Sequence, residues 1–217
     1  MRIRSFIIAY ALVLAILLFA DRRPDPNRQN RYSHVVDLTD AQHFNGPRAS
    51  AADSRTRIVS PAALIPGTWS AGQIPAERLV APLVVIDLKS SPNGASPISL
   101  DDLAAWESIY GVVPQGAIVA IRRTSAGSPS SNALPITADA AQFLMDARYT
   151  LGFAIETSVD FTSDRPLARQ LALHGNYVVQ GTTPLTSLPQ TGSLLIVAPA
   201  KNKTSAQAPV RVLAVVR

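Results

Sequence analysis

Few side chains in this sequence are of the types that bind metal ions or transfer protons. The chain has three histidines, His34, His43 and His174, and no two of them stand two or four residues apart. Histidines at those spacings commonly share a metal ion, so the sequence contains no metal-binding histidine pair of that kind. His174 falls in the last turn of a predicted helix, where a positive charge suits the helix dipole.

Carboxylates give a second, weaker set of candidates. Asp37, Asp40 and His43 fall within seven residues and could bind an ion, but a solvated loop is the simpler interpretation. Glu156 and Asp160 stand four residues apart at a predicted strand end, where carboxylates serve as acids or bases and more commonly as caps. The chain has no cysteine, no Gly-x-Ser-x-Gly motif and no glycine-rich phosphate loop. Disulfides and cysteine nucleophiles are therefore excluded, and nothing indicates a serine hydrolase or a nucleotide-binding enzyme.

Three segments have the caps and apolar spacing of helices: 99–111, 137–148 and 165–175. In the first, Ser99 can cap the helix, two aspartates complement the dipole in the first turn, and Gly111 can end it. Strands are predicted by β-branched or continuous apolar runs at 32–40, 79–88, 116–123, 151–160, 176–180, 193–199 and 209–216. Strand and helix alternate in the middle of the chain, which predicts one α/β domain with a mixed sheet.

Composition and charge restrict the possible partners. The chain has 217 residues, 47% of them hydrophobic, and a formal net charge of +5. This content predicts a globular domain, and no Lys/Arg-rich run with interleaved aromatic residues points to nucleic-acid binding.

The N-terminal segment has a targeting pattern. Two arginines precede an apolar run that ends at Ala20, which is short for a membrane span and typical of a signal peptide. Leu18 stands where a cleavage site needs a small residue, so residues 1–20 are predicted to be an uncleaved anchor or a poorly cleaved signal peptide. Residues 21–31 then form a polar tether, and the domain of residues 32–217 is membrane-anchored or secreted to the periplasm.

Residues 61–88, PAALIPGTWSAGQIPAERLVAPLVVIDL, resemble the bacterial cyclase family, whose best-known members are kynurenine formamidases. VVDLT (35–39) is similar to the family's first strand, residues 98–124 to its helix and following strand, and 197–216 to its closing hairpin. The resemblance implies a single cyclase-like swivelling β/β/α domain. Members of the family are oligomeric hydrolases that use zinc or manganese.

The resemblance also identifies where the catalytic residues should lie. The family's signature is His-x-Gly-Thr-His-x-Asp-x-Pro-x-His, followed later by a His and a Glu. With the proline aligned on Pro61, the family's site positions fall on Asp53, Arg57, Val59, Ala63, Ala168 and Gln180. Only Asp53 could still bind a metal, because a guanidinium repels one and the remaining side chains provide no ionic ligand. The alignment therefore predicts no catalytic residue and no cofactor.

The first hypothesis that follows is a catalytically degenerate, membrane-associated binding or partner protein. Its ligand would be a small carboxylate or amide, with Arg57 pairing a carboxylate and Trp69 packing at the pocket mouth. Its partner would be a second copy of the chain or an active relative.

Two alternatives remain open. The chain could be an active amide or lactone hydrolase of the arylformamidase type, which converts N-formylkynurenine to kynurenine. That activity would need ligands from a small pool: Asp53, Asp40, His43, Glu156 and Asp160. The other alternative is a structural or interaction module that binds no small molecule.

Overall fold

The computed structural model describes residues 34–40, 56–91, 94–123, 133–161, 165–201 and 203–217. Residues 34–217 form one compact unit. The predicted anchor or signal peptide and the tether lie outside the described residues. In the part of the chain that is described, no helix has the length and apolar character needed to cross a membrane.

Strands and helices occur throughout this unit. The strands are β1 (His34–Asp37), β2 (Arg57–Val59), β3 (Val80–Leu88), β4 (Ser90–Ser91), β5 (Gly94–Ala95), β6 (Ile118–Arg123), β7 (Gly152–Ile155), β8 (Tyr177–Gln180), β9 (Ser193–Pro199) and β10 (Gln207–Val216). The helices are α2 (Leu100–Tyr110), α3 (Ala138–Arg148) and α4 (Arg165–Leu173), with short 3₁₀ helices η3 (Pro61–Ala63), η4 (Ala71–Gln73), η5 (Ala76–Arg78) and η6 (Leu185–Ser187). The predicted mixed α/β fold is confirmed.

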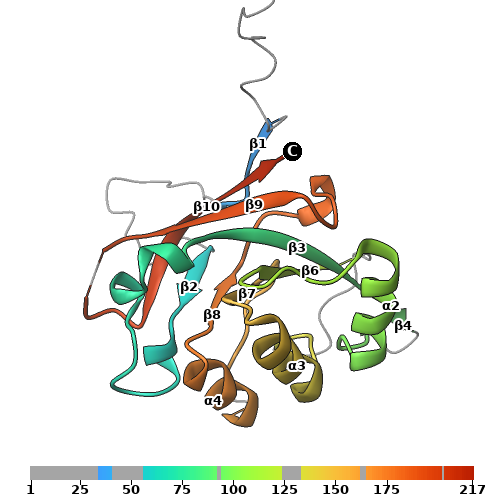
Figure 1. Cartoon of the computed structure of the whole chain (residues 1–217). Coiled ribbons are helices and arrows are strands. Elements are labelled where there is room, and N and C mark those ends of the chain that lie inside the picture. Colours follow the sequence, from blue (N-terminus) through green and yellow to red (C-terminus); the bar gives the residue numbers. More distant parts are fainter. Residues whose placement is uncertain (1–33, 41–55, 92–93, 124–132, 162–164, 202) are drawn as a thin grey trace, which may run out of the picture. The chain divides into compact units, whose positions relative to one another are not determined.

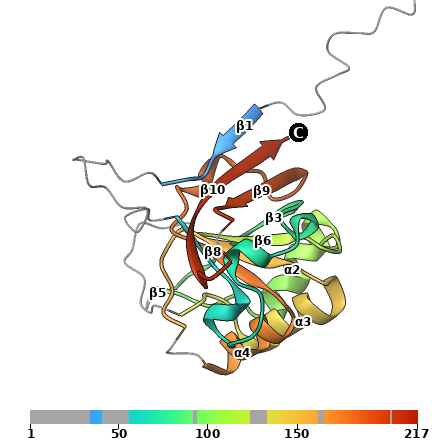
Figure 2. The ribbon, with the colours of Figure 1, turned by 90° about the vertical axis from the view of Figure 1, so that its left-hand side faces the viewer.

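One large sheet closes on itself. Its eight strands follow the order β1-β10-β2-β8-β7-β6-β3-β9, and β9 also pairs with β10. This extra pairing closes the strands from β10 to β9 into a ring, and β1 lies outside the ring, paired with β10 (Figure 2). Neighbours β3, β6, β7 and β8 run parallel, while β2, β9 and β10 pair antiparallel with their neighbours. The sheet is therefore mixed and closed like a barrel.

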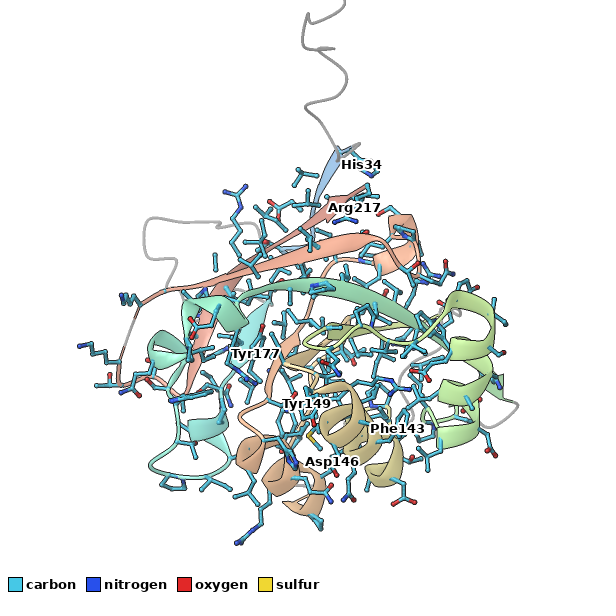
Figure 3. The ribbon with its side chains drawn as sticks, viewed as in Figure 1. His34, Phe143, Asp146, Tyr149, Tyr177 and Arg217 are labelled. Atoms are coloured by element: carbon cyan, nitrogen blue, oxygen red, sulfur yellow. The ribbon has the colours of Figure 1, made fainter. Side chains whose placement is uncertain are left out.

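The strands separate two cores. Side chains that point into the ring, such as Leu83 and Val85 of β3, form one buried cluster with Tyr177. The alternate side chains, such as Val84 and Ile86, form a second cluster with the three helices. Helices α2, α3 and α4 lie together on the same side of β3 and β6 (Figure 1), and Phe143, Asp146 and Tyr149 mark that side in Figure 3. Because both faces of β3 are covered, its sequence is a continuous apolar run, as predicted.

The helix caps follow the sequence closely. Ser99 accepts a hydrogen bond from the Asp102 backbone N–H, and the Asp102 carboxylate accepts from the Ser99 backbone, which completes a capping box. Gly111 follows α2 with a φ of 88°, a conformation that favours glycine. Helix α3 is followed instead by Tyr149, a residue other than glycine that adopts φ 50°.

The sequence did not predict β2, the β4–β5 pair or the 3₁₀ helices. Strand β2 has three residues, too few to show a periodic pattern. It forms because β10 pairs with it on one side and β8 on the other. Pairing with distant strands therefore decides its structure, and local propensity does not.

The capping box makes part of the stability depend on pH. The Lys89 ammonium, together with hydrogen bonds from Ser99, lowers the pKa of Asp102 to about 2. Since the folded pKa lies below the unfolded one, this stabilisation is present above about pH 4 and is lost as the pH falls toward 2. We expect the Asp102→Asn variant to lose about 1–2 kcal/mol of unfolding free energy at pH 6, and much less at pH 2.

Urea unfolding at both pH values measures this difference. Lys89→Met is the matched control, because it removes the ammonium and keeps the capping box; it should show a smaller loss with the same pH trend. An equal loss for Asp102→Asn at both pH values would show that the carboxylate charge has no part in the effect.

Candidate functional site

The predicted site positions on β2 point toward the helices. Ile58 belongs to the cluster inside the ring, and its neighbour Val59 belongs to the cluster under the helices. Side chains alternate along a strand, so Arg57 lies on the same face as Val59. Arg57 pairs in register with Gln180 of β8, which brings two predicted positions 123 residues apart in sequence next to each other.

A cavity of about 450 Å³ opens between β2, η3 and α4. Three predicted positions, Val59, Ala63 and Ala168, line it from these three separate elements. We call it the β2–α4 cavity, and its lining comprises Val59, Ala63, Leu64, Ile65, Val159, Asp160, Phe161, Ala168, Arg169 and Gln207. Its wall is mostly aliphatic and aromatic, with one acidic and one basic side chain. The chain thus brings predicted positions together at a cavity able to hold a small molecule.

Gln180 is fixed by a specific hydrogen bond. Gln180 lies at the end of β8 and is only 7% exposed. The amide Oε1 accepts a hydrogen bond of 2.9 Å from the backbone N–H of Val159. Val159 belongs to the loop after β7, and this loop supplies three of the cavity's lining residues. The amide therefore connects the end of β8 to the cavity wall.

Thr56 holds the adjoining backbone. It is fully buried, and its Oγ1 donates a 2.6 Å hydrogen bond to the carbonyl of Gly181. The same oxygen accepts a 2.7 Å hydrogen bond from the backbone N–H of Asp40. One hydroxyl thus connects the residue before β2, the residue after β8 and the chain that follows β1.

The side chains at the predicted positions do not fit a divalent ion. Such an ion needs about three imidazole or ionised ligands, whereas the described positions hold a guanidinium, an isopropyl group, two methyl groups and an amide. Among the residues that the structure describes, no three His, Asp or Glu side chains form a group able to hold a metal. Asp53 and His43 lie outside these residues.

The remaining candidate ligands are scattered. Both Glu156 oxygens accept backbone hydrogen bonds, one from Arg123 and one from Leu185, so this carboxylate caps loops at the end of β7. Asp160 lines the β2–α4 cavity, and Asp40 follows β1. Sequence reasoning placed Glu156 and Asp160 together, but the structure gives them different surroundings.

Trp69 belongs to a different place from the β2–α4 cavity. It lines a second cavity of about 290 Å³ with Pro61, Gly67, Thr68, Ala172, Leu173, His174 and Gly175. The Arg78 guanidinium lies 5.5 Å from the centre of the indole ring and donates a hydrogen bond to the carbonyl of Gly175. Burial lowers the pKa of Arg78 and raises that of Tyr177, whose hydroxyl donates to the Arg78 carbonyl. Neither Arg57 nor Trp69 is among the residues that line the β2–α4 cavity.

Comparison with known proteins gives the family. The model of the Cyclase family, described as "Putative cyclase", matches residues 33–160, more than half of the chain. The chain belongs to the Cyclase family. No curated protein matches it. The family predicted from residues 61–88 is therefore confirmed.

Solved structures share the fold of this Cyclase-family chain. Isatin hydrolase A from Labrenzia aggregata, bound to benzyl benzoate, is 26% identical, with a TM-score of 0.67 over 84% of this chain and 93% of that one. Isatin hydrolase A from Ralstonia solanacearum is 24% identical, with a TM-score of 0.66 over 85% and 92%. A potential metal-dependent hydrolase with cyclase activity is 22% identical, with a TM-score of 0.63 over 85% and 98%. The predicted cyclase-like fold is thus confirmed.

Several cavity residues escaped sequence reasoning. Val159 falls inside the strand predicted at 151–160, although β7 ends at Ile155, and Phe161 follows that prediction. Arg169 lies on a predicted helix, and Gln207 begins β10. Their types are ordinary for their elements, so no local signal distinguishes them. A different part of the lining does have a signal in the sequence. The run at 62–65 is apolar, which is unusual for a loop, and it supplies three lining residues.

The Thr56 hydroxyl gives a direct test of how the site backbone is held. We expect Thr56→Val to lower the free energy of unfolding by about 2–3 kcal/mol, because it leaves a half-buried N–H and a buried carbonyl without this partner. Urea unfolding measures the change. The control is Thr183→Val, whose hydroxyl makes only a 3.4 Å hydrogen bond to the carbonyl of Asp37. Equal losses in the two variants would contradict a special role for Thr56.

Proposed function

We propose that this Cyclase-family domain is a catalytically degenerate binding protein that takes a small molecule in the β2–α4 cavity. One observation carries the proposal: Val59, Ala63 and Ala168, the residues that the alignment assigns to the family's site, line one cavity with aliphatic side chains. The cavity has the size of a ligand site, and its wall lacks the ligands of a metal hydrolase.

The chemistry of the donor set argues against hydrolysis. In the family, a divalent ion supplies a nucleophile by lowering the pKa of its bound water. The side chains here do not fit that ion, and a neutral water attacks an amide very slowly at neutral pH. Arg57 is a permanent cation beside this site, which further disfavours a bound metal.

The lining favours a neutral ligand that has both polar and apolar groups. Seven lining residues are aliphatic or aromatic, from Val59 to Ala168, while Asp160 and Arg169 contribute opposite charges. An ester or amide group could accept a hydrogen bond from Arg169 or Gln207, and its apolar groups would contact the remaining wall. Benzyl benzoate, an aromatic ester seen bound to a relative 26% identical to this chain, is a suitable probe.

Metal binding tests the proposal that this domain has lost the family's metal site. We expect the purified wild-type chain, after incubation with zinc or manganese and dialysis, to hold well below one ion per chain by elemental mass spectrometry. The combined variant Arg57→His, Val59→Asp and Gln180→Glu places three possible ligands side by side on one face of β2 and β8. Its thermal unfolding temperature should rise when zinc is added, and that of the wild type should not.

The alternative of an active hydrolase makes the opposite prediction. A tightly held ion at one per chain, with metal-dependent turnover of isatin or N-formylkynurenine, would reject degeneracy. Ligands would then have to include Asp53 or His43, which lie outside the described residues. Alanine at those two positions would abolish the turnover.

Ligand binding tests the location of the site. We expect benzyl benzoate to bind the wild-type chain, and Ala63→Phe to weaken binding by at least about tenfold, because the added ring occupies the cavity. Titration followed by tryptophan fluorescence or calorimetry gives both affinities. Ala105→Phe, on an exposed part of α2, is the matched control and should bind like the wild type. Equal affinities for all three proteins would place the ligand elsewhere.

A further inference from the structure

The loop after β7 forms one wall of the β2–α4 cavity. Its residues Val159, Asp160 and Phe161 all line the cavity, so a shift of this loop would change the shape of the binding space. Two backbone hydrogen bonds hold the start of the loop to the chain after β8, from Gly181 to Thr157 and from Thr182 to Ile155. Both hydrogen bonds are accepted by residues that precede the part of the loop lining the cavity.

Gln180 holds the part of the loop that faces the cavity. Its Oε1 accepts the 2.9 Å hydrogen bond from the Val159 N–H, and Val159 is the first lining residue of the loop. Gln180 as a residue is 7% exposed, so water has limited access to the side of the hydrogen bond that the amide occupies. Val159 is half-buried, so an N–H that lost this acceptor would turn toward water, and the loop would shift with it.

The strand itself does not need this side chain. Strand β8 is already paired in register with β7 through Tyr177–Val179 and with β2 through Val178–Gln180. Its other side chains belong to the two cores. The Gln180 amide therefore adds a connection from a rigid strand to the cavity wall.

We propose that Gln180 is a positioning residue that fixes the Val159–Phe161 wall and thereby sets the affinity of the β2–α4 cavity for its ligand. The inference rests on the proposed function, since it assumes that this cavity is the binding site. It also gives a role to Gln180 at a position where the family resemblance implies a metal ligand. In this chain the neutral amide of Gln180 orders the loop after β7 through the hydrogen bond from Val159.

The acceptor can be removed or kept by single substitutions. Gln180→Leu keeps a similar volume and has no acceptor, whereas Gln180→Glu keeps an oxygen at the same distance along the side chain. Gln190→Leu is the matched control: it removes an amide that donates a 3.5 Å hydrogen bond to Asp87, away from the cavity lining. Gln180→Met, which is unbranched, serves in place of leucine should that variant not fold.

Two measurements on each protein test the inference. Amide hydrogen exchange by NMR reports on the Val159 N–H itself, and titration with benzyl benzoate reports on the cavity. We expect Gln180→Leu to speed exchange at Val159 by about tenfold or more, with exchange in β10 unchanged, and to weaken binding by about three- to tenfold. Gln180→Glu should stay within about twofold of the wild type in both measurements, and so should Gln190→Leu.

The outcomes separate this inference from the proposed function. Unchanged exchange at Val159 in Gln180→Leu would overturn the positioning role, whatever the ligand does. Faster exchange with unchanged affinity would overturn the link to binding. If the wild type fails to bind benzyl benzoate while exchange responds as expected, the choice of cavity ligand fails and the loop contact stands.

Discussion

The closure of the sheet by β10 is the constraint on which the site depends. The last strand pairs with β9 along one edge and with both β1 and β2 along the other. Without β10, β2 would have a partner on one side only, and a three-residue strand has little stability of its own. Closure therefore fixes β2 beside β8. That register puts Arg57 opposite Gln180 and turns Val59 toward α4.

Successive side chains along these strands belong alternately to the two cores. Side chains inside the ring, such as Ile58 and Val179, are apolar and close packed. The positions next to them face the helices, where α4 and η3 leave the β2–α4 cavity. A change of one residue in register would exchange the two sets, so the position of the cavity is determined by the pairing of the strands.

Much of the fold could be predicted because its signals are local. Ser99 and Gly111 delimit α2 as expected, and the apolar run of β3 indicates a strand buried on both faces. The hydrogen bond from Val159 to Gln180 could not be predicted, since it joins a loop to a strand end through a side chain of an ordinary type. Trp69 was expected at the mouth of the same pocket as Arg57, but its surroundings depend on the nearby Arg78 and on Gly175, which approaches it from a segment about a hundred residues away in the sequence.

The position of β1 has a consequence for the connectivity of the domain. His34, at the start of β1, pairs in register with Val216, one residue before the C-terminal Arg217, and both labelled residues lie at the same end of the domain (Figure 3). The path of the chain from β1 to β10 is therefore nearly cyclic. A short covalent link between these two ends would require no change in strand register, and the order of elements along the gene is only one of several orders compatible with this ring.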